Sequence, residues 1–136
     1  MMTIFSKIIK GEIPSYKIAE NDQFYAFLDI NPLQKGHTLV VPKLAEPEED
    51  YIFNLDDALL ADMIVFSKKV AEAIKEYTAC PRVAVAVLGM EVPHVHIHLV
   101  PLFKESDMNF SNPKLSLSPE EMAQIAQQIA EKVTLS

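Results

Sequence analysis

Three of the four histidines of the chain lie within residues 93–101, which read Pro-His-Val-His-Ile-His-Leu-Val-Pro. His94, His96 and His98 occupy every second position, and apolar residues stand between them. Strict alternation over one short run predicts a β-strand. Because successive side chains of a strand point to opposite faces, the three imidazoles should share one face.

A row of imidazoles could bind a metal ion or carry out a reaction. Neutral imidazole is the commonest protein ligand for zinc. On a strand, however, side chains two residues apart lie about 6.6 Å apart, and those four apart about 13 Å. With metal–nitrogen bonds of about 2 Å, one ion can join two neighbouring histidines but hardly three. We therefore favour a reaction on phosphate over a metal site or a solvated strand face, with one imidazole attacking and its neighbours assisting.

Residues 94–100 resemble the His-x-His-x-His-x-x signature, with x apolar, of the histidine-triad (HIT) family of nucleotide hydrolases and transferases. Further segments resemble this family in the same order. They are residues 4–9, 11–14, 26–32 and 36–43. The resemblance runs from about residue 3 to residue 101 and is closest to the bacterial branch of nucleoside phosphoramidase-like proteins.

The pattern of strands and two main helices predicts an α+β domain with an antiparallel sheet. The resemblance implies five strands, one long central helix, a C-terminal helix, and a homodimer in which two sheets join edge to edge. One HIT domain would then cover residues 1–136, with the triad region ending at about 101 and the C-terminal helix at about 118–133.

Hydrophobic periodicity indicates where the elements lie. Strands are predicted at residues 16–20, 24–28, 37–41, 83–88 and 93–101. The run at 83–88 is apolar at every position, which predicts a central strand. A long helix capped by Asn54 or Asp56 should reach about residue 77, and Ser118 with Glu121 predicts a cap for the last helix. Apolar residues three or four positions apart predict one buried stripe along the long helix: Leu59, Met63, Phe66, Val70, Ile74 and Tyr77. The acidic loop at residues 45–50 is interpreted as a solvated connection.

The resemblance also implies roles for the four histidines. His96 would be the nucleophile that forms a transient nucleotidyl-histidine, and neutral imidazole has the lone pair this needs near pH 7. His98 would contact the phosphate oxygens and the bridging atom, and His94 would help to orient the nucleophile. His37 would support the triad from the neighbouring strand.

The same resemblance implies a nucleotide pocket. The carboxylate of Asp29 would bind the ribose hydroxyls, although a turn or capping aspartate fits the sequence as well. Between residues 83 and 102 there is no lysine or arginine, so backbone N–H groups and imidazoles would have to bind the phosphate. The expected binding residues are Phe5, Ile8, Phe27, Asp29, Ile30, Asn31, Leu39, Gly89, Met90, Glu91 and Val92. For Phe5, Ile8 and Phe27, ordinary core packing explains the sequence equally well.

Two departures from the family pattern limit what is carried over. Met90 and Glu91 stand where many relatives have a glutamine followed by serine or threonine, and an ionised Glu91 beside phosphate would be repulsive. Glu91 would have to turn outward, be protonated, or pair with a cationic leaving group. Zinc-binding members carry cysteines and a histidine where this chain has Thr3, Ser6 and Ala45. We therefore expect no metal and no cofactor.

Composition excludes several classes of function. A chain of 136 residues with a net charge of −7 is one domain that is poorly suited to binding DNA or RNA. No apolar run is long enough to span a membrane, and residues 1–7 predict the start of a helix rather than a signal peptide. With a lone Cys80, we expect a reducing cytoplasm. Together with the resemblance, which implies the substrate class, the sequence predicts a cytoplasmic hydrolase of purine nucleoside 5′-phosphoramidates or related conjugates. The alternatives are a dinucleoside polyphosphate hydrolase, a catalytically weak nucleotide-binding module and a His-x-His metal site.

Overall fold

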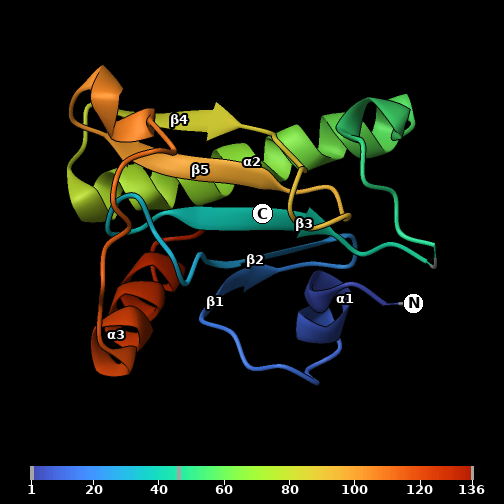
Figure 1. Cartoon of the computed structure of the whole chain (residues 1–136), viewed down its shortest axis with the longest axis horizontal. Helices are drawn as coiled ribbons and strands as arrows, with labels where there is room; N and C mark the ends of the chain where they lie inside the picture. The colour runs from blue at the N-terminus through green and yellow to red at the C-terminus, as the bar shows by residue number, and fades with distance from the viewer. Residues whose placement is uncertain (1, 46, 136) are drawn as a thin grey trace.

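The computed structural model describes residues 2–45 and 47–135, and it has the predicted α+β architecture with an antiparallel five-stranded sheet (Figure 1). The elements are α1 (Ile4–Ile9), β1 (Lys17–Glu20), β2 (Phe24–Leu28), β3 (Thr38–Pro42), η1 (Ile52–Asn54), α2 (Asp57–Thr78), β4 (Arg82–Ala86), β5 (Ile97–Leu102), η2 (Glu105–Met108) and α3 (Pro119–Ala130). The strand order is β1-β2-β3-β5-β4. None of the helices in the described residues is both long and apolar enough to cross a membrane.

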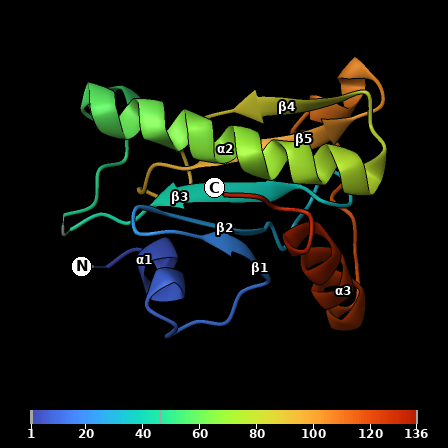
Figure 2. The same cartoon turned by 180° about the vertical axis from the view of Figure 1, so that it is seen from behind.

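The sheet separates two apolar clusters because its central strands alternate their side chains. Helices α2 and α3 cover one face, where they bury Phe24, Ala26 and Leu28 of β2 (Figure 2). The intervening residues Tyr25 and Phe27 point to the other face and pack against α1. The short helix α1 therefore rests on a face that the two long helices leave uncovered.

Side-chain caps fix the starts of the long helices. The carboxylate of Asp56 accepts the Leu59 N–H at 2.8 Å, so Asp56 rather than Asn54 is the cap of α2. Ser118 and Glu121 form the predicted capping box of α3. The predicted stripe of α2 is confirmed at four positions that are buried against the sheet: Met63, Phe66, Val70 and Ile74.

One strand lies in a different place from the prediction. The apolar run at residues 83–88 predicts a central strand, but β4 forms the edge of the sheet and pairs only with β5 among the described strands. Val85 is 57% exposed and Leu88 is 53% exposed. Apolar residues on both faces of this strand therefore do not reflect burial within this chain.

The histidine segment is also less regular than predicted. Strand β5 begins only at Ile97, whose pairing with Val40 is the last step of its ladder with β3. Further along β3, Pro42 has no N–H to donate, and its carbonyl accepts the imidazole of His94 instead of a backbone N–H. The chain before Ile97 consequently leaves the sheet, although Val95, Ile97 and Leu99 still share the buried face.

Candidate active site

A cavity of about 480 Å³ opens on the sheet face that carries α1, a volume in the range of small-molecule sites. Its walls come from α1, the ends of β2 and β3, residues 88–92, the histidine segment and the loop after β5. All eleven expected binding residues line it: Phe5, Ile8, Phe27, Asp29, Ile30, Asn31, Leu39, Gly89, Met90, Glu91 and Val92. Of the four histidines, His37, His96 and His98 line the cavity and His94 does not.

The inner wall of the cavity is apolar. Four of the residues that line it also belong to the smaller apolar cluster: Phe5, Ile8, Phe27 and Leu39. These side chains are therefore part of the core and part of the cavity wall at the same time. The ring of Phe5 stands edge-on to that of His96, with centroids 5.0 Å apart. A flat base lying on this wall would therefore bring its attached phosphate toward the histidines.

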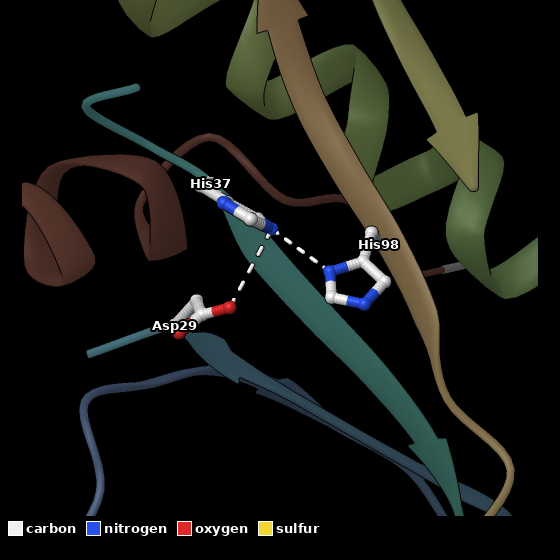
Figure 3. A group of neighbouring side chains, drawn as sticks. All are labelled: Asp29, His37 and His98. Carbon is white, nitrogen blue, oxygen red and sulfur yellow. Dashed lines mark hydrogen bonds and ion pairs between the residues drawn. The ribbon is translucent and has the colours of Figure 1, made fainter. Parts of the chain in front are cut away.

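A backbone N–H fixes the protons on the pair formed by His37 and His98 (Figure 3). The Leu33 N–H donates to Nδ1 of His37 at 3.0 Å, so the proton of a neutral His37 is on Nε2. That Nε2–H then donates to Nδ1 of His98 at 2.9 Å. His98 must carry its own proton on Nε2, and it presents an N–H donor to a ligand in the cavity.

His96 has the opposite tautomer. Its Nδ1–H donates to the backbone carbonyl of His94 at 2.7 Å, which leaves the lone pair on Nε2. The side chain is only 6% exposed, and it lines the cavity beside His98, with ring centroids 5.1 Å apart. The site therefore offers one nucleophilic nitrogen next to one N–H donor.

His94 is fully buried, and both nitrogens of its ring are hydrogen-bonded to other residues of the protein. Its Nε2–H donates to the carbonyl of Pro42 at 2.9 Å, and its Nδ1 accepts the hydroxyl of Thr3 at 2.8 Å. The orienting contact between His94 and His96 is made by the backbone carbonyl and not by the imidazole. The sequence could not distinguish these two possibilities.

Burial keeps three of the histidines neutral. Desolvation, followed by the charge of His98, lowers the pKa of His37 to about 3. Desolvation, followed by the charge of His96, lowers the pKa of His98 to about 4. Burial also lowers the pKa of His94. Near neutral pH these rings consequently act as dipoles with fixed tautomers and not as cations.

Asp29 serves a turn and also faces the cavity. Its Oδ1 accepts the Asn31 N–H at 2.8 Å, as a turn aspartate would, while Oδ2 lies 3.6 Å from Nε2 of His37 (Figure 3). Burial raises the pKa of the Asp29 carboxyl, and the hydrogen bond from Asn31 opposes that shift. The second oxygen is therefore available to accept a hydroxyl donor.

Asp29, His37 and His98 lie close enough together to hold one cation. A metal would need the lone pair of Nε2 on His37. The Leu33 N–H donates to Nδ1 of that ring, so the ring proton is on Nε2 and no lone pair is free at that nitrogen. The tautomer of His37 does not fit a metal ligand. Thr3 and Ser6, at the positions where zinc-binding relatives carry cysteines, offer hydroxyl groups that are already hydrogen-bonded.

The loop after β5 contributes two residues that the sequence analysis missed. Phe110 stands edge-on to His98 with centroids 5.0 Å apart, and Lys114 donates to the carbonyl of Phe110 at 2.6 Å. The Leu115 N–H anchors this loop to the carbonyl of Pro32. The expectation that only N–H groups and imidazoles supply positive charge was wrong, because Lys114 also lines the cavity. The weak periodicity of this loop gave no signal for either residue.

The two departures from the family pattern lie at the mouth of the cavity. The side chain of Met90 is 90% exposed, and Glu91 is exposed beside it. Gly89 has a φ of +72°, and a Cβ there would lie 3.2 Å from the carbonyl oxygen of Asp50. Of the three interpretations of Glu91, the outward-turned one agrees with its exposure.

Comparison with known proteins gives the family. The HIT domain model matches residues 10–105. The chain belongs to the HIT-domain family. An uncharacterized HIT-like protein of Borreliella burgdorferi is 37% identical over 135 residues, covering 93% of this chain and 95% of that protein. The adenosine 5′-monophosphoramidase of Schizosaccharomyces pombe is 36% identical and covers 98% of this chain and 99% of its own.

A solved structure supports the family fold. The crystal structure of a Hit-like protein involved in cell-cycle regulation from Bartonella henselae aligns with a TM-score of 0.80 and 28% identity, covering 96% of each chain. The antiparallel five-stranded sheet with its helices is therefore the fold of this family, as the resemblance of the histidine segment predicts.

Proposed function

We propose that this HIT protein is a nucleotide hydrolase that cleaves purine nucleoside 5′-phosphoramidates or related conjugates to the nucleoside monophosphate. The observation that carries the proposal is the pair of opposite tautomers at the cavity. Nε2 of His96 holds a lone pair, and Nε2 of His98 holds a proton. A phosphate between them meets a nucleophile and a donor for its oxygen.

The reaction proceeds in two displacements at phosphorus. Nε2 of His96 bonds to phosphorus as the phosphorus–nitrogen bond to the amine breaks, and the amine leaves with a proton from solvent at the cavity mouth. Water then bonds to phosphorus and gives up a proton to solvent while the bond to His96 breaks, which restores the lone pair on Nε2. His98 donates to the phosphate oxygen in both steps, where negative charge develops.

The nucleotide lies with its base on the apolar wall and its ribose at Asp29. The wall is formed by side chains such as Phe5 and Phe27, and the free Oδ2 of Asp29 accepts a ribose hydroxyl. The name of the fission yeast relative, an adenosine 5′-monophosphoramidase, supports a purine nucleotide and a phosphoramidate bond.

A dinucleoside polyphosphate hydrolase is the second candidate, and Lys114 is the observation that favours it. The ammonium group of Lys114 is held by two loop carbonyls beside the cavity and would attract further phosphates. Glu91, exposed at the mouth, carries the opposite charge and would repel these further phosphates, which favours a phosphoramidate instead.

A turnover screen with trapping tests the function. Purified protein is assayed on nucleoside phosphoramidates, dinucleoside polyphosphates and plain phosphate esters, with and without a chelator. We expect phosphoramidates to be hydrolysed fastest and chelation to have no effect. Rapid quenching with a labelled substrate should leave acid-labile label on the peptide that contains His96.

His96→Ala provides the matched variant for trapping. Its turnover should fall on the order of several powers of ten, as in other enzymes that lose their nucleophile, while nucleotide binding remains measurable. His96→Asn should be as inactive, because an amide has no nucleophilic nitrogen. Label on another residue would contradict the mechanism, and nucleotide binding without any turnover in the wild type would favour the binding-module alternative.

We also propose a cytoplasmic homodimer joined through β4. The exposed apolar residues of this edge strand and its extension, among them Val85 and Leu88, would be buried by a second sheet. Light scattering should give twice the chain mass for the wild type. Val85→Lys should give the monomer if this edge forms the interface.

A further inference from the structure

The first helix is connected to the histidine segment through one hydroxyl group. Thr3, the cap of α1, lies 2.8 Å from Nδ1 of His94, although the two residues are 91 positions apart in sequence. Glu48, from the acidic loop that was expected to be a solvated connection, accepts the Thr3 N–H at 3.2 Å and the Ser6 hydroxyl at 2.6 Å. We call Thr3, Ser6, Glu48 and His94 the N-terminal clamp.

The direction of each hydrogen bond in the clamp is determined. Nε2 of His94 must carry a proton because it faces the carbonyl of Pro42. Nδ1 of the neutral ring is then an acceptor, and the Thr3 hydroxyl donates to it. The same hydroxyl oxygen accepts the Ser6 N–H at 3.1 Å. Thr3 is therefore both the cap of α1 and the hydrogen-bond donor to His94.

His96 is contacted by two groups that the clamp holds in place, the carbonyl of His94 and the ring of Phe5. The carbonyl of His94 accepts the Nδ1–H of His96 at 2.7 Å, and the ring of Phe5 on α1 packs edge-on to both His94 and His96. The acidic loop adds a backbone bond from the Val95 N–H to the carbonyl of Glu49 at 2.9 Å. Glu46 of this loop lies outside the described residues.

We propose that Thr3 is a positioning residue for the nucleophile. By donating to His94 it fixes the carbonyl that orients His96, and by capping α1 it holds Phe5 against the rings of His94 and His96. This inference rests on the proposed function, in which His96 attacks phosphorus. Thr3 itself does not line the cavity, so it acts only through His94 and α1.

The fold offers a matched control for the cap. Ser118 caps α3 through its own hydroxyl, which accepts the Glu121 N–H at 3.1 Å, and α3 packs on the opposite face of the sheet. Ser118→Ala removes a helix cap without touching the clamp. Thr3→Val removes the hydroxyl but keeps the shape of the side chain, and Thr3→Ser keeps the hydroxyl.

The experiment compares these three variants in the full chain. We expect Thr3→Val to lower kcat by about tenfold while KM changes less than about twofold, as loss of alignment predicts. Thr3→Ser should retain wild-type kcat, and Ser118→Ala should lower the melting temperature as Thr3→Val does without changing kcat. The Nδ1–H proton of His96, bonded to the His94 carbonyl, provides a readout by NMR that needs no turnover.

That proton should give a downfield signal in the wild type, Thr3→Ser and Ser118→Ala, and should broaden or disappear in Thr3→Val. Unchanged kcat and an unchanged signal in Thr3→Val would overturn the inference. Equal losses in Thr3→Val and Thr3→Ser would also overturn it, because keeping the hydroxyl in Thr3→Ser would then not be enough to keep His96 in place. If the wild type has no turnover, the proposed function fails, and the NMR signal alone still decides whether Thr3 positions His96.

Discussion

His94 and His98 stand symmetrically about His96 in the sequence, but the structure uses them in opposite ways. Both nitrogens of His94 are bonded to the protein, at Pro42 and Thr3, and the side chain is fully buried. His98 is bonded at one nitrogen, to His37, and lines the cavity. One end of the row is therefore part of the scaffold, and the other faces the ligand.

The partners of each ring produce this difference. Near His94 the carbonyl of Pro42 requires a proton on Nε2, and the Thr3 hydroxyl occupies Nδ1. Near His98 the donor is His37, whose tautomer is set by the backbone of Leu33. Identical side chains in a repeated pattern acquire different functions because the residues packed against them differ.

Of the variants at the two ends of the row, His98→Ala should have the largest effect on kcat. His98→Ala removes the N–H donor to the phosphate, and we expect kcat to fall by about 10²–10³-fold, as for an oxyanion donor in other enzymes. Single-turnover kinetics on the best phosphoramidate measures this loss. His98→Asn, which keeps an N–H donor, should recover part of it. A loss below tenfold in His98→Ala would remove this residue from the stabilisation of charge.

His94→Ala should have a smaller effect on the rate and a larger one on stability. The backbone carbonyl that orients His96 persists in this variant, so we expect kcat to fall only about tenfold. The carbonyl of Pro42 and the Thr3 hydroxyl lose a buried partner, which should cost about 2–3 kcal/mol in the free energy of unfolding. Urea unfolding measures this cost. Wild-type stability with a rate loss as large as that of His98→Ala would reverse the two assignments.

Stability should depend on pH through His37 and His98, the hydrogen-bonded pair at the end of the row that faces the cavity. Burial lowers the pKa of His37 to about 3 and that of His98 to about 4, whereas the unfolded chain binds these protons near pH 6.5. Between pH 6.5 and about 4 the unfolded state holds more protons. The free energy of unfolding therefore falls as the pH falls, by about 1.4 kcal/mol per pH unit for each histidine that stays neutral.

Urea unfolding at pH 7, 6 and 5 checks this dependence. His98→Asn, which lacks one of the groups, should show a shallower fall between pH 6 and pH 5 than the wild type. Stability that is constant over this range would mean that the rings are not held neutral by burial.

Much of the fold could be predicted from local patterns. The caps at Asp56 and Ser118 and the buried stripe of α2 depend on neighbours three or four residues away, and those signals were correct. The edge position of β4 could not be predicted, because an apolar run does not specify what covers it. Strand order is set by pairing over long separations, which a run of residues does not encode.

The site was predictable to a similar degree. The spacing of the histidine row predicted a shared face, and the expected binding residues do surround one cavity. The tautomers were not predictable, because each depends on a distant partner such as Leu33 for His37 or Thr3 for His94. Phe110 and Lys114 were missed for the same reason, since only the anchored loop after β5 brings them to the cavity.

The smallest expected effect concerns the aromatic rings that cover the two ends. Phe5 packs on His94 and His96 from α1, and Phe110 packs on His98 from the loop after β5. Phe110→Ala admits water to His98, which relieves desolvation and should raise its pKa toward the ordinary value. We expect kcat at neutral pH to fall only on the order of threefold, because the N–H donor is still present and only its surroundings become more polar. An NMR titration of His98 measures the shift, and Phe110→Leu, which keeps most of the apolar cover, should titrate like the wild type. An unchanged pKa in Phe110→Ala would mean that the sheet and His37 alone exclude water from this end of the row.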